Sequence, residues 1–452
     1  MQADLLIANT TIVTMNPRRD ILTDASVVIS SDRIADLGPA AAIASRYPNA
    51  SVTDGKSKVV LPGLINCHTH LSMSLQKGIT LAVPDGLYRV MWPVEKSLTP
   101  EDCYVGALAG AAEALKGGTT CAVDHYFHME EIAKATTELG LRGVLGHTIM
   151  SRLGPIVGER ELEEGIDFVR RWKGRHPLVI PWLAPHASDT VKQDWLIKLR
   201  ETAEAEGVGL HLHLAQSTRE REYVREHHGL GCVEYLRDID FLGDDVLAAH
   251  CIFVDDHELD LLAESGAHPL YCPMGHALHG TPQRAWELIQ RGAKVLIGTD
   301  CVCADNVMDL VGELRIAGAS QKQMTRDLLA MPALKILETV TVDAAEAIGM
   351  GGQLGSVAPG YLADLVLLNF KGLHTAPNYS LLDNIVYCCN GRDVDTVVVN
   401  GRVVVRAGRL TTADEDDLVA RVEETGRALM RRALDSEPDL AWLWQSSFSP
   451  TE

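Results

Sequence analysis

The stretch Leu61-Pro62-Gly63-Leu64-Ile65-Asn66-Cys67-His68-Thr69-His70 carries a short apolar run that ends in two histidines. The run at 64–67 predicts a buried β-strand. Because residues i and i+2 of an extended segment point to the same face, we expect His68 and His70 to project together from the end of that strand. Two imidazoles on one face form a ligand pair that suits zinc. The pair alone is weak evidence, since two polar residues at a strand end can also be incidental.

Seven more apolar runs follow this one, and amphipathic segments of helical period separate them. Eight strands that alternate with helices predict an α/β fold in which the strands close into a (β/α)8 TIM barrel, here over residues 61–350. The expected strands are 64–67, 119–124, 143–147, 179–183, 208–214, 246–251, 268–272 and 294–299.

Both ends of the chain show a different, alternating pattern that is typical of short β-strands. Apolar runs of this kind occur before residue 60 and return after residue 351, where Asn400-Gly401 separates two of them in the manner of a hairpin turn. We therefore expect residues 1–60 and 351–410 to form one composite β-sandwich domain, with the barrel inserted between its halves. Residues 411–452 are expected to form a C-terminal helical extension.

Barrel enzymes place their active sites at the carboxyl ends of the strands, and three further strands of this chain carry reactive residues there. The fifth contains His211 and His213, of which His213 is nearer the carboxyl end and the better ligand. The deeper His211 is more simply a hydrogen-bonded core residue. The sixth strand reaches His250, and the eighth leads into Asp300. Residues of this kind on four strands predict a metal site.

Composition and charge exclude several classes of protein. The 452 residues are 46% hydrophobic and 23% charged, which is ordinary for a globular protein. With 41 basic and 61 acidic residues the net charge is −20, so neither nucleic acid nor an anionic membrane surface is an expected partner. No apolar run approaches the ~18 residues of a membrane span, and the N-terminus lacks the basic residues of a secretory signal. The 10 scattered cysteines then favour a cytoplasmic protein with reduced thiols.

Taken in order, these motifs resemble the amidohydrolase superfamily, in particular its cytosine- and guanine-deaminase-like and triazine-hydrolase-like branch. The resemblance implies a metal-dependent hydrolase that acts on a C–N bond of an aminated aromatic or heterocyclic small molecule or cyclic amide, and it implies a homodimer. The stretches that carry it span almost the whole chain: Leu61 to His70, Gly117-Gly118-Thr119-Thr120, Ala184-Pro185-His186-Ala187, His211-Leu212-His213-Leu214-Ala215, Ala249-His250-Cys251, Gly298-Thr299-Asp300 and Gly360-Tyr361-Leu362-Ala363-Asp364-Leu365.

The resemblance also implies one divalent ion per chain, Zn²⁺ first and Fe²⁺ as the alternative, held by His68, His70, His213 and Asp300. It implies that His250 contacts the metal-bound water or the substrate oxygen. Zinc lowers the pKa of its water toward ~7, and Asp300 beside it can accept that proton. Binuclear relatives need a bridging lysine or glutamate at the end of the fourth strand. This chain has neither there, so a single ion is expected.

Three regions depart from the family's pattern. Gln216 stands where the family usually has a proton-shuttling glutamate, and an amide cannot exchange a proton at neutral pH. Gly86, beside Asp85, stands where relatives often have tryptophan, so an indole that would wall the pocket is missing. After the seventh and eighth strands, His276 replaces a common asparagine and Cys301 replaces a glycine. We interpret Cys301 as a small wall residue rather than one half of a soft metal pair.

These departures fall at positions expected to face the substrate, whereas the metal ligands are intact. Arg152 can bind a substrate carboxylate in bidentate fashion, although an ordinary surface arginine is equally consistent with its position. Catalytic roles are expected for Asp300, His250 and Gln216. Substrate contacts are expected from His186, Asp85, Gly86, Arg152, His276 and Cys301.

Two reaction classes remain open at this point. The first is hydrolysis, in which metal-activated water attacks the carbon of the C–N bond. In the second, the metal polarises a carbonyl of an aromatic amino-hydroxy acid derivative of secondary metabolism, an internal amine or hydroxyl attacks it, and a ring closes with loss of water. Gln216 is the reason for the second hypothesis, because ring closure can dispense with the shuttle. A third hypothesis, a metal-binding scaffold without activity, is disfavoured by the complete ligand set.

Overall fold

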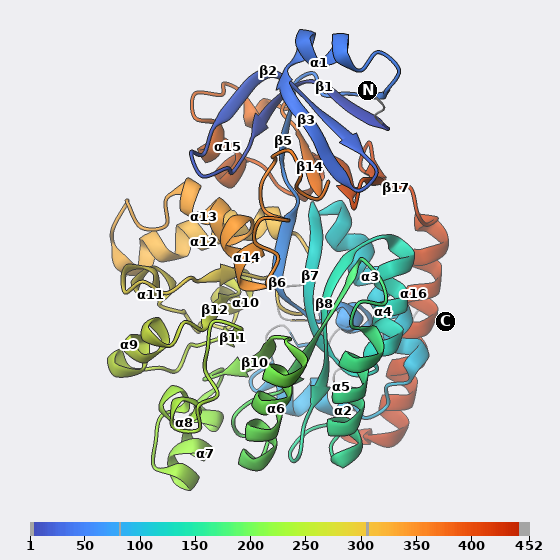
Figure 1. The fold of residues 1–452 in the computed structure, drawn as a ribbon. Coiled ribbons are helices and arrows are strands. Elements are labelled where there is room, and N and C mark those ends of the chain that lie inside the picture. Colours follow the sequence, from blue (N-terminus) through green and yellow to red (C-terminus); the bar gives the residue numbers. More distant parts are fainter. Residues whose placement is uncertain (1–3, 81–82, 304–306, 443–452) are drawn as a thin grey trace.

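The structure is a computed structural model that describes residues 4–80, 83–303 and 307–442. Eight parallel strands form one sheet whose spatial order follows the chain (Figure 1). A bridge between Thr69 and Asp300 brings the first and eighth strands together and nearly closes the barrel, as the sequence predicted. The strands are β6 (Leu64–Thr69), β7 (Thr119–Tyr126), β8 (Arg142–Ile149), β9 (Val179–Pro185), β10 (Leu210–Leu214), β11 (Val246–His250), β12 (His268–Tyr271) and β13 (Leu296–Ile297).

Helices surround the barrel, and several begin at a residue that caps them. Thr99 and Asp102 form a capping box at the start of α3, as Asp255 and Glu258 do at the start of α9. The barrel-side helices are α2 (Trp92–Glu95), α3 (Pro100–Lys116), α4 (Met129–Leu139), α5 (Glu159–Trp172), α6 (Gln193–Glu206), α7 (Thr218–His228), α8 (Cys232–Asp238), α9 (Asp256–Ser265), α10 (Pro273–Leu278), α11 (Ala285–Gln290), α12 (Leu310–Thr325), α13 (Ala333–Thr339) and α14 (Val342–Ala347). A 3₁₀ helix, η1 (Leu71–Gln76), and a short π-helix, η2 (Leu87–Met91), lie in the connection after β6.

The two chain ends meet in a second sheet, as predicted, because β14 pairs antiparallel with β5 (Figure 1). The helices α1 (Ala40–Arg46) and α15 (Leu381–Cys388) belong to these terminal segments. Asn400 and Gly401 have positive φ angles between β15 and β16, in keeping with a hairpin turn. The strands are β1 (Leu5–Val13), β2 (Ile21–Ser30), β3 (Arg33–Pro39), β4 (Ser51–Asp54), β5 (Lys58–Pro62), β14 (Leu365–Asn369), β15 (Val394–Val399), β16 (Arg402–Arg406) and β17 (Arg409–Leu410).

A buried ion pair joins the barrel to this second sheet. Arg142 at the start of β8 donates from Nε and Nη2 to the two carboxylate oxygens of Asp364, at 2.9 and 3.0 Å. Both side chains are almost completely buried. The Asp364 carboxylate also accepts from the backbone N–H of Asn400 at 2.7 Å. The Ala363-Asp364 motif therefore holds the barrel and the hairpin together.

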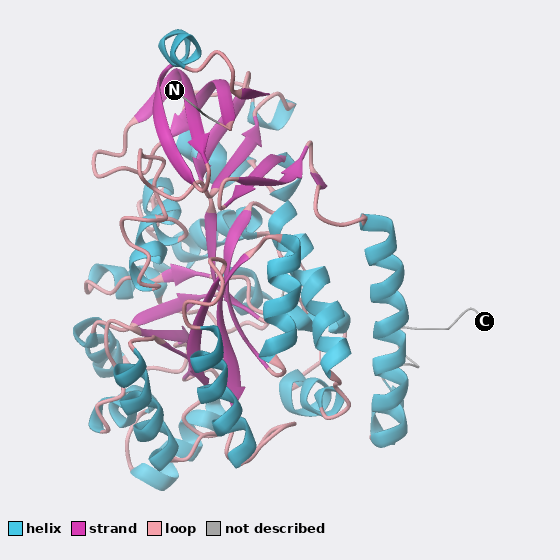
Figure 2. Ribbon diagram, turned by 45° about the vertical axis from the view of Figure 1, so that its right-hand side comes forward, coloured by secondary structure: helices cyan, strands magenta, loops and turns pink. Residues whose placement is uncertain are grey.

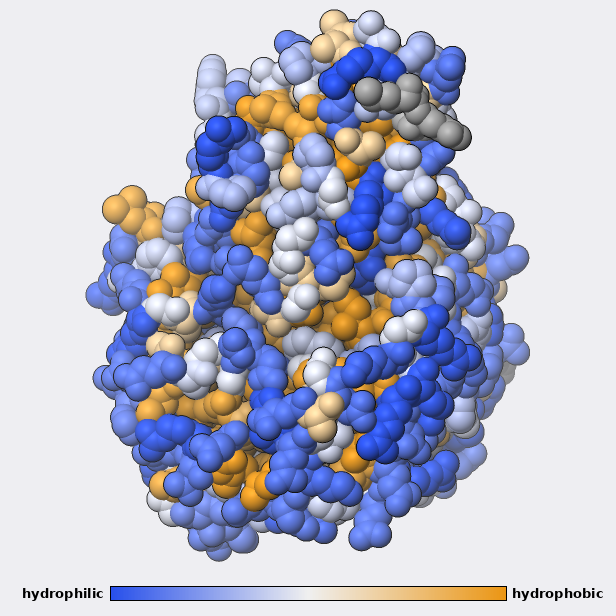
Figure 3. All heavy atoms as spheres, viewed as in Figure 1, coloured by the Kyte–Doolittle hydropathy of each residue, from blue (hydrophilic) through white to orange (hydrophobic). Residues whose placement is uncertain are grey.

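The C-terminal helix α16 (Glu415–Ser436) lies along the outside of the barrel, followed by η5 (Pro438–Leu440) (Figures 1 and 2). Its Leu429, Met430 and Ala433 are buried in a cluster with Val94 and Val105 of the barrel. No helix among the described residues is long and apolar enough to cross a membrane. Hydrophilic side chains cover most of the barrel face in Figure 3, in keeping with the high charge.

Candidate metal centre and active-site pocket

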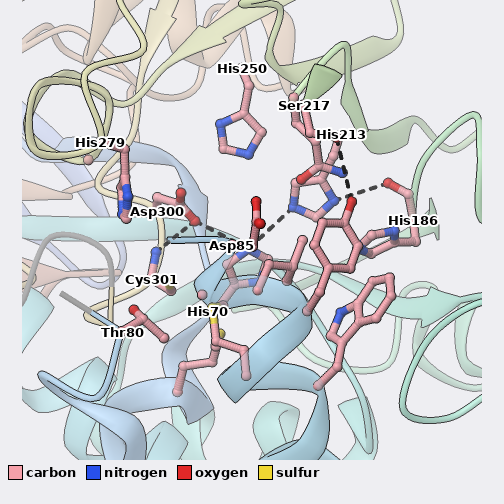
Figure 4. Close-up of a pocket in the computed structure, with 18 of the residues that line it drawn as sticks. His70, Thr80, Asp85, His186, His213, Ser217, His250, His279, Asp300 and Cys301 are labelled. Atoms are coloured by element: carbon pink, nitrogen blue, oxygen red, sulfur yellow. Dashed lines mark hydrogen bonds and ion pairs between the residues drawn. The ribbon is translucent and has the colours of Figure 1, made fainter. Parts of the chain in front are cut away.

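Three histidines and one aspartate converge at the carboxyl ends of β6, β10 and β13. Figure 4 shows three of these residues, His70, His213 and Asp300, at one cavity. The Nε2 atoms of His70 and His213 lie 3.3 Å apart. One carboxylate oxygen of Asp300 lies 3.4 Å from Nε2 of His70 and 3.5 Å from Nε2 of His68. The ligands of a tetrahedral zinc ion with bonds near 2.1 Å are about 3.4 Å from one another. These three distances match the spacing of ligands around one ion, and each of the four predicted ligands takes part in at least one of them.

Backbone carbonyls hold two of these rings in the orientation that a ligand needs. Nδ1 of His70 donates to the carbonyl oxygen of His125 at 2.5 Å, and Nδ1 of His213 donates to that of His186 at 3.0 Å. A ring whose hydrogen is on Nδ1 presents a lone pair at Nε2. Both Nε2 lone pairs therefore face the proposed ion, which is the outer-shell arrangement common to metal-binding histidines.

His68 is oriented by another histidine instead of a carbonyl. Its Nδ1 lies 2.9 Å from Nε2 of His211, which the sequence predicted to be a core residue rather than a ligand. Nε2 of His68 is buried and has no hydrogen-bond partner among the described residues. Such an orphaned buried nitrogen is costly unless something binds it. Its position between the other donors fits a metal ligand.

Asp300 is ionised in this setting. Burial alone would raise the pKa of its carboxyl, but the Nε2 atoms of His68 and His70, which can carry a hydrogen when no ion is bound, hold that pKa well below its usual range by hydrogen bonding. The carboxylate also accepts from the backbone N–H of Cys301 at 2.7 Å, and this hydrogen bond helps to fix its orientation. A carboxylate that stays ionised at neutral pH can serve both as a ligand and as a proton acceptor.

A cavity of about 420 Å³ opens above these four residues. This volume is in the range of small-molecule sites, roughly 300–1,000 Å³. Of the residues predicted to be catalytic or to contact substrate, the cavity is lined by His186, Asp85, Gly86, His276, Cys301, Gln216, His250 and Asp300. None of its described lining residues is lysine or arginine, and the acidic ones are Asp85, Glu95 and Asp300.

Arg152 is the one predicted substrate contact that the structure does not bring to this cavity. Its Nε donates to the carbonyl oxygen of Asp189 at 2.8 Å. Its guanidinium lies 4.5 Å from the ring centre of Tyr223. The side chain is therefore engaged on the outside of the barrel mouth, because the segment after β8 turns it toward Asp189 and α7 rather than toward the metal ligands.

An aromatic wall survives although Gly86 replaces the usual tryptophan. Tyr88 in η2 and Trp92 at the start of α2 line the cavity, and their rings meet edge to face at 4.8 Å. The Trp92 ring centre lies 6.2 Å from that of His186. Residues two and six positions farther along the chain therefore supply the flat surface that the sequence indicated was missing.

Glu95 and Tyr126 line the cavity but were missed by the sequence analysis. The Tyr126 hydroxyl donates to Glu95 at 2.7 Å. Burial raises the pKa of Glu95 to about 7, even though the Tyr126 hydrogen bond works in the opposite direction. Tyr126, like the neighbouring His125, lies at the carboxyl end of a barrel strand that extends two residues beyond its predicted end. That position was the available signal, whereas Glu95 comes from a connection with no comparable pattern.

Gln216 follows β10 and lines the cavity with its side chain, as predicted. Its backbone N–H donates to Glu220 at 2.8 Å. Glu220 is completely buried and also accepts from the Ser188 hydroxyl at 2.6 Å. Because Glu220 does not line the cavity, it supports the loop rather than replacing the missing glutamate.

The barrel, the converging histidines and aspartate and the pocket together are typical of a metal-dependent hydrolase with a small-molecule substrate. The chain belongs to the amidohydrolase family, whose family model matches residues 59–404. A 5'-deoxyadenosine deaminase of Methanosarcina mazei is 33% identical over 434 residues, which cover 95% of this chain and 99% of that protein. A 5-methylthioadenosine/S-adenosylhomocysteine deaminase of Pelotomaculum thermopropionicum is 33% identical over 435 residues, covering 95% and 100%.

Solved structures agree with this fold. An adenosine deaminase from Xanthomonas campestris with bound zinc superposes with a TM-score of 0.90 at 27% identity, covering 95% of this chain and 99% of that one. A variant of atrazine chlorohydrolase from Arthrobacter aurescens, complexed with zinc and atraton, has a TM-score of 0.86 at 21% identity, covering 93% and 100%. The second likeness concerns the fold alone.

Proposed function

We propose that the protein is a deaminase that hydrolyses the exocyclic C–N bond of an adenosine-type nucleoside with an uncharged 5' end and releases ammonia. The observation that carries the proposal is the ligand set of His68, His70, His213 and Asp300 at the floor of an aromatic-walled cavity. Relatives that match over almost their full length are named as deaminases of 5'-deoxyadenosine and of 5-methylthioadenosine/S-adenosylhomocysteine. One zinc ion per chain is the cofactor that this donor set suits best, with iron as the alternative.

The lining of the cavity supports an uncharged substrate. A phosphate or carboxylate entering it would meet Asp85 and Glu95 and no lysine or arginine. Burying an anion without a cationic partner is costly. Tyr88 and Trp92 offer flat faces for a heteroaromatic ring. A nucleoside that ends in a methyl or methylthio group therefore suits this cavity better than a nucleotide.

Within this reaction, the chain's own residues have separate roles. When bound, a divalent ion supplies Lewis-acid activation of water. Asp300 accepts the first proton of the attacking water at its carboxylate and delivers it to the ring nitrogen beside the attacked carbon. It then accepts the second proton from the added hydroxyl and delivers it to the amine, which leaves as ammonia. His250 faces the cavity and contacts the attacking oxygen or the ring. Gln216 holds the ring by hydrogen bonds through its amide but transfers no proton.

Ring closure remains the second candidate function, and Gln216 is the observation that favours it. Its amide occupies the cavity wall where a proton shuttle is expected. A cyclodehydration needs carbonyl polarisation, which the same ligand set supplies to a substrate with an internal amine or hydroxyl. An aromatic amino-hydroxy acid would bring a carboxylate into the cavity, which its acidic lining disfavours.

The test is an ammonia-release assay on the zinc-loaded protein with 5'-deoxyadenosine, 5'-methylthioadenosine and adenosine 5'-monophosphate. We expect turnover of the first two, none of the nucleotide, and about one zinc per chain by elemental analysis. Asp300→Asn is the matched variant and should lower kcat at least 100-fold. Absence of ammonia from both nucleosides, with water loss from an ortho-amino-hydroxy aromatic amide or ester, would replace deamination with ring closure.

A further inference from the structure

The two histidines on the far side of the metal centre form a direct nitrogen pair. Nδ1 of His250 lies 3.1 Å from Nε2 of His276. The side chains are 8% and 4% exposed, so the contact is shielded from bulk water. A nitrogen–nitrogen contact of this length needs a hydrogen on one of the two atoms and a lone pair on the other.

The backbone holds His276 firmly in place for this contact. It lies in α10, where its N–H donates to the carbonyl of Cys272 at 2.9 Å and its own carbonyl accepts from Thr281 at 2.9 Å. Its ring packs against Tyr271 with the ring centres 5.5 Å apart. On the other side, the carbonyl of His250 accepts from the Gln283 side chain. The backbone on both sides therefore fixes the positions of the His250 and His276 rings, and neither ring belongs to an exposed side chain.

The hydrogen between the rings can belong to either nitrogen, and the surroundings favour one choice. Nδ1 of His276 is buried and has no protein partner among the described residues. If that atom carried the hydrogen, a buried N–H donor would be left unpaired, which is rare in proteins. If Nε2 of His276 carries the hydrogen, its N–H donates to Nδ1 of His250. The atom left without a protein partner among the described residues is then Nδ1 of His276 as an acceptor.

We propose that His276 is a positioning residue whose Nε2–H donates to Nδ1 of His250 and so fixes the hydrogen of His250 on Nε2. The Nδ1 contact leaves Nε2 as the nitrogen with which His250 faces the cavity (Figure 4). His250 then acts as a hydrogen-bond donor toward the reacting oxygen or ring atom. It does not act as the base, so the first proton goes to Asp300.

The kinetic part of this inference rests on the proposed function, whereas the position of the hydrogen does not. His250, Cys272 and His276 also lie close enough together to hold a second ion. An ion there would take the lone pairs of the same nitrogen pair and remove the hydrogen bond. The hydrogen-bonded pair and the second ion site differ in the number of ions bound per chain and in which nitrogen of His250 carries the hydrogen.

Substitutions at His276 distinguish the hydrogen bond to His250 from the packing of the His276 ring. A glutamine places its amide nitrogen near the position of Nε2, whereas an asparagine reaches only to the position of Nδ1. We expect His276→Gln to keep kcat within about threefold, and His276→Asn and His276→Leu to lower it about 10- to 100-fold with KM within about twofold. Zinc content and Tm are recorded for each variant. A His276→Leu protein with native Tm and native kcat would overturn the proposal.

A substrate-free measurement tests the hydrogen directly. In zinc-loaded protein with ¹⁵N-labelled histidine, the ring couplings of His250, assigned by their loss in His250→Gln, should show a protonated Nε2 and an unprotonated Nδ1. In His276→Leu the couplings of the His250 ring should show a mixture of the two tautomers instead of a hydrogen on Nε2 alone. A protonated Nδ1 on His250 in the native protein, or two ions per chain with one lost in His276→Gln, would refute the proposal. If deamination fails while the Nε2–H pattern is found, only the proposed function is wrong.

Discussion

Nδ1 of His68 and Nε2 of His211 lie 2.9 Å apart inside the barrel, one layer below the metal centre. Because the Nε2 atom of His68 faces Asp300 and the other ligands, its Nδ1 carries the hydrogen and donates to His211. His211 lies two residues before His213 in β10 and is itself buried. The strand therefore supplies one ligand and, through His211, the support of another.

His211→Leu should weaken zinc binding about 10- to 100-fold without abolishing it, because outer-shell partners of metal-bound histidines have effects of this size. His211→Gln, whose side-chain oxygen can still accept from His68, should stay within about threefold of the native affinity. Competition with a chromogenic chelator measures both. Equal zinc affinity in the leucine variant and the native protein would show that His211 only fills space.

Gln216→Glu should raise ammonia release from 5'-methylthioadenosine at least 10-fold, because a carboxyl can transfer the proton that an amide cannot. Gln216→Leu is the matched control that removes the hydrogen bonds without adding an acid, and it should lower kcat/KM. Steady-state kinetics at pH 7 checks both variants. Slower ammonia release by the glutamate variant would mean that the native reaction has no use for a shuttle at this position.

Glu95→Gln should change the pH dependence of stability. The pKa of Glu95 is about 7 in the folded protein against 4.5 for an ordinary glutamate. The protonated carboxyl therefore adds its full contribution to the free energy of unfolding below pH 4.5, and that contribution is lost as the pH rises through 7. That shift corresponds to about 3 kcal/mol. Relative to the native protein, the variant should therefore gain up to this amount between pH 5 and pH 8. Urea unfolding at several pH values measures this difference. If the free energies of unfolding of the two proteins differed by the same amount at every pH, the raised pKa assigned to Glu95 would be wrong.

Arg142→Met should destabilise the fold by about 3–5 kcal/mol, because it leaves the carboxylate of Asp364 buried and unpaired. The double variant Arg142→Met with Asp364→Leu removes both charges and should recover most of the loss. Urea unfolding measures both. A single-variant loss below about 1 kcal/mol would show that water reaches this carboxylate once the guanidinium is gone.

Local pattern was enough to predict the barrel and the residues that meet at its carboxyl end. Apolar runs mark the strands, and a residue's place within its strand decides whether it reaches the carboxyl end, as His70 and His213 do. Likewise, Asn400-Gly401 predicted a hairpin because both residues accept the positive φ angles that its turn requires. These features depend on neighbours in the chain, so sequence alone contains them.

Contacts between distant segments had to come from the tertiary structure. His211 contacts His68 only because β6 and β10 face each other across the barrel, and Glu95 reaches the cavity because the connection after β6 folds over the barrel mouth. Arg152, just beyond β8, is turned away to Asp189 and Tyr223. A strand's sequence determines which side chains point inward, but the partners they meet depend on how separate strands and connections pack, which no single segment encodes.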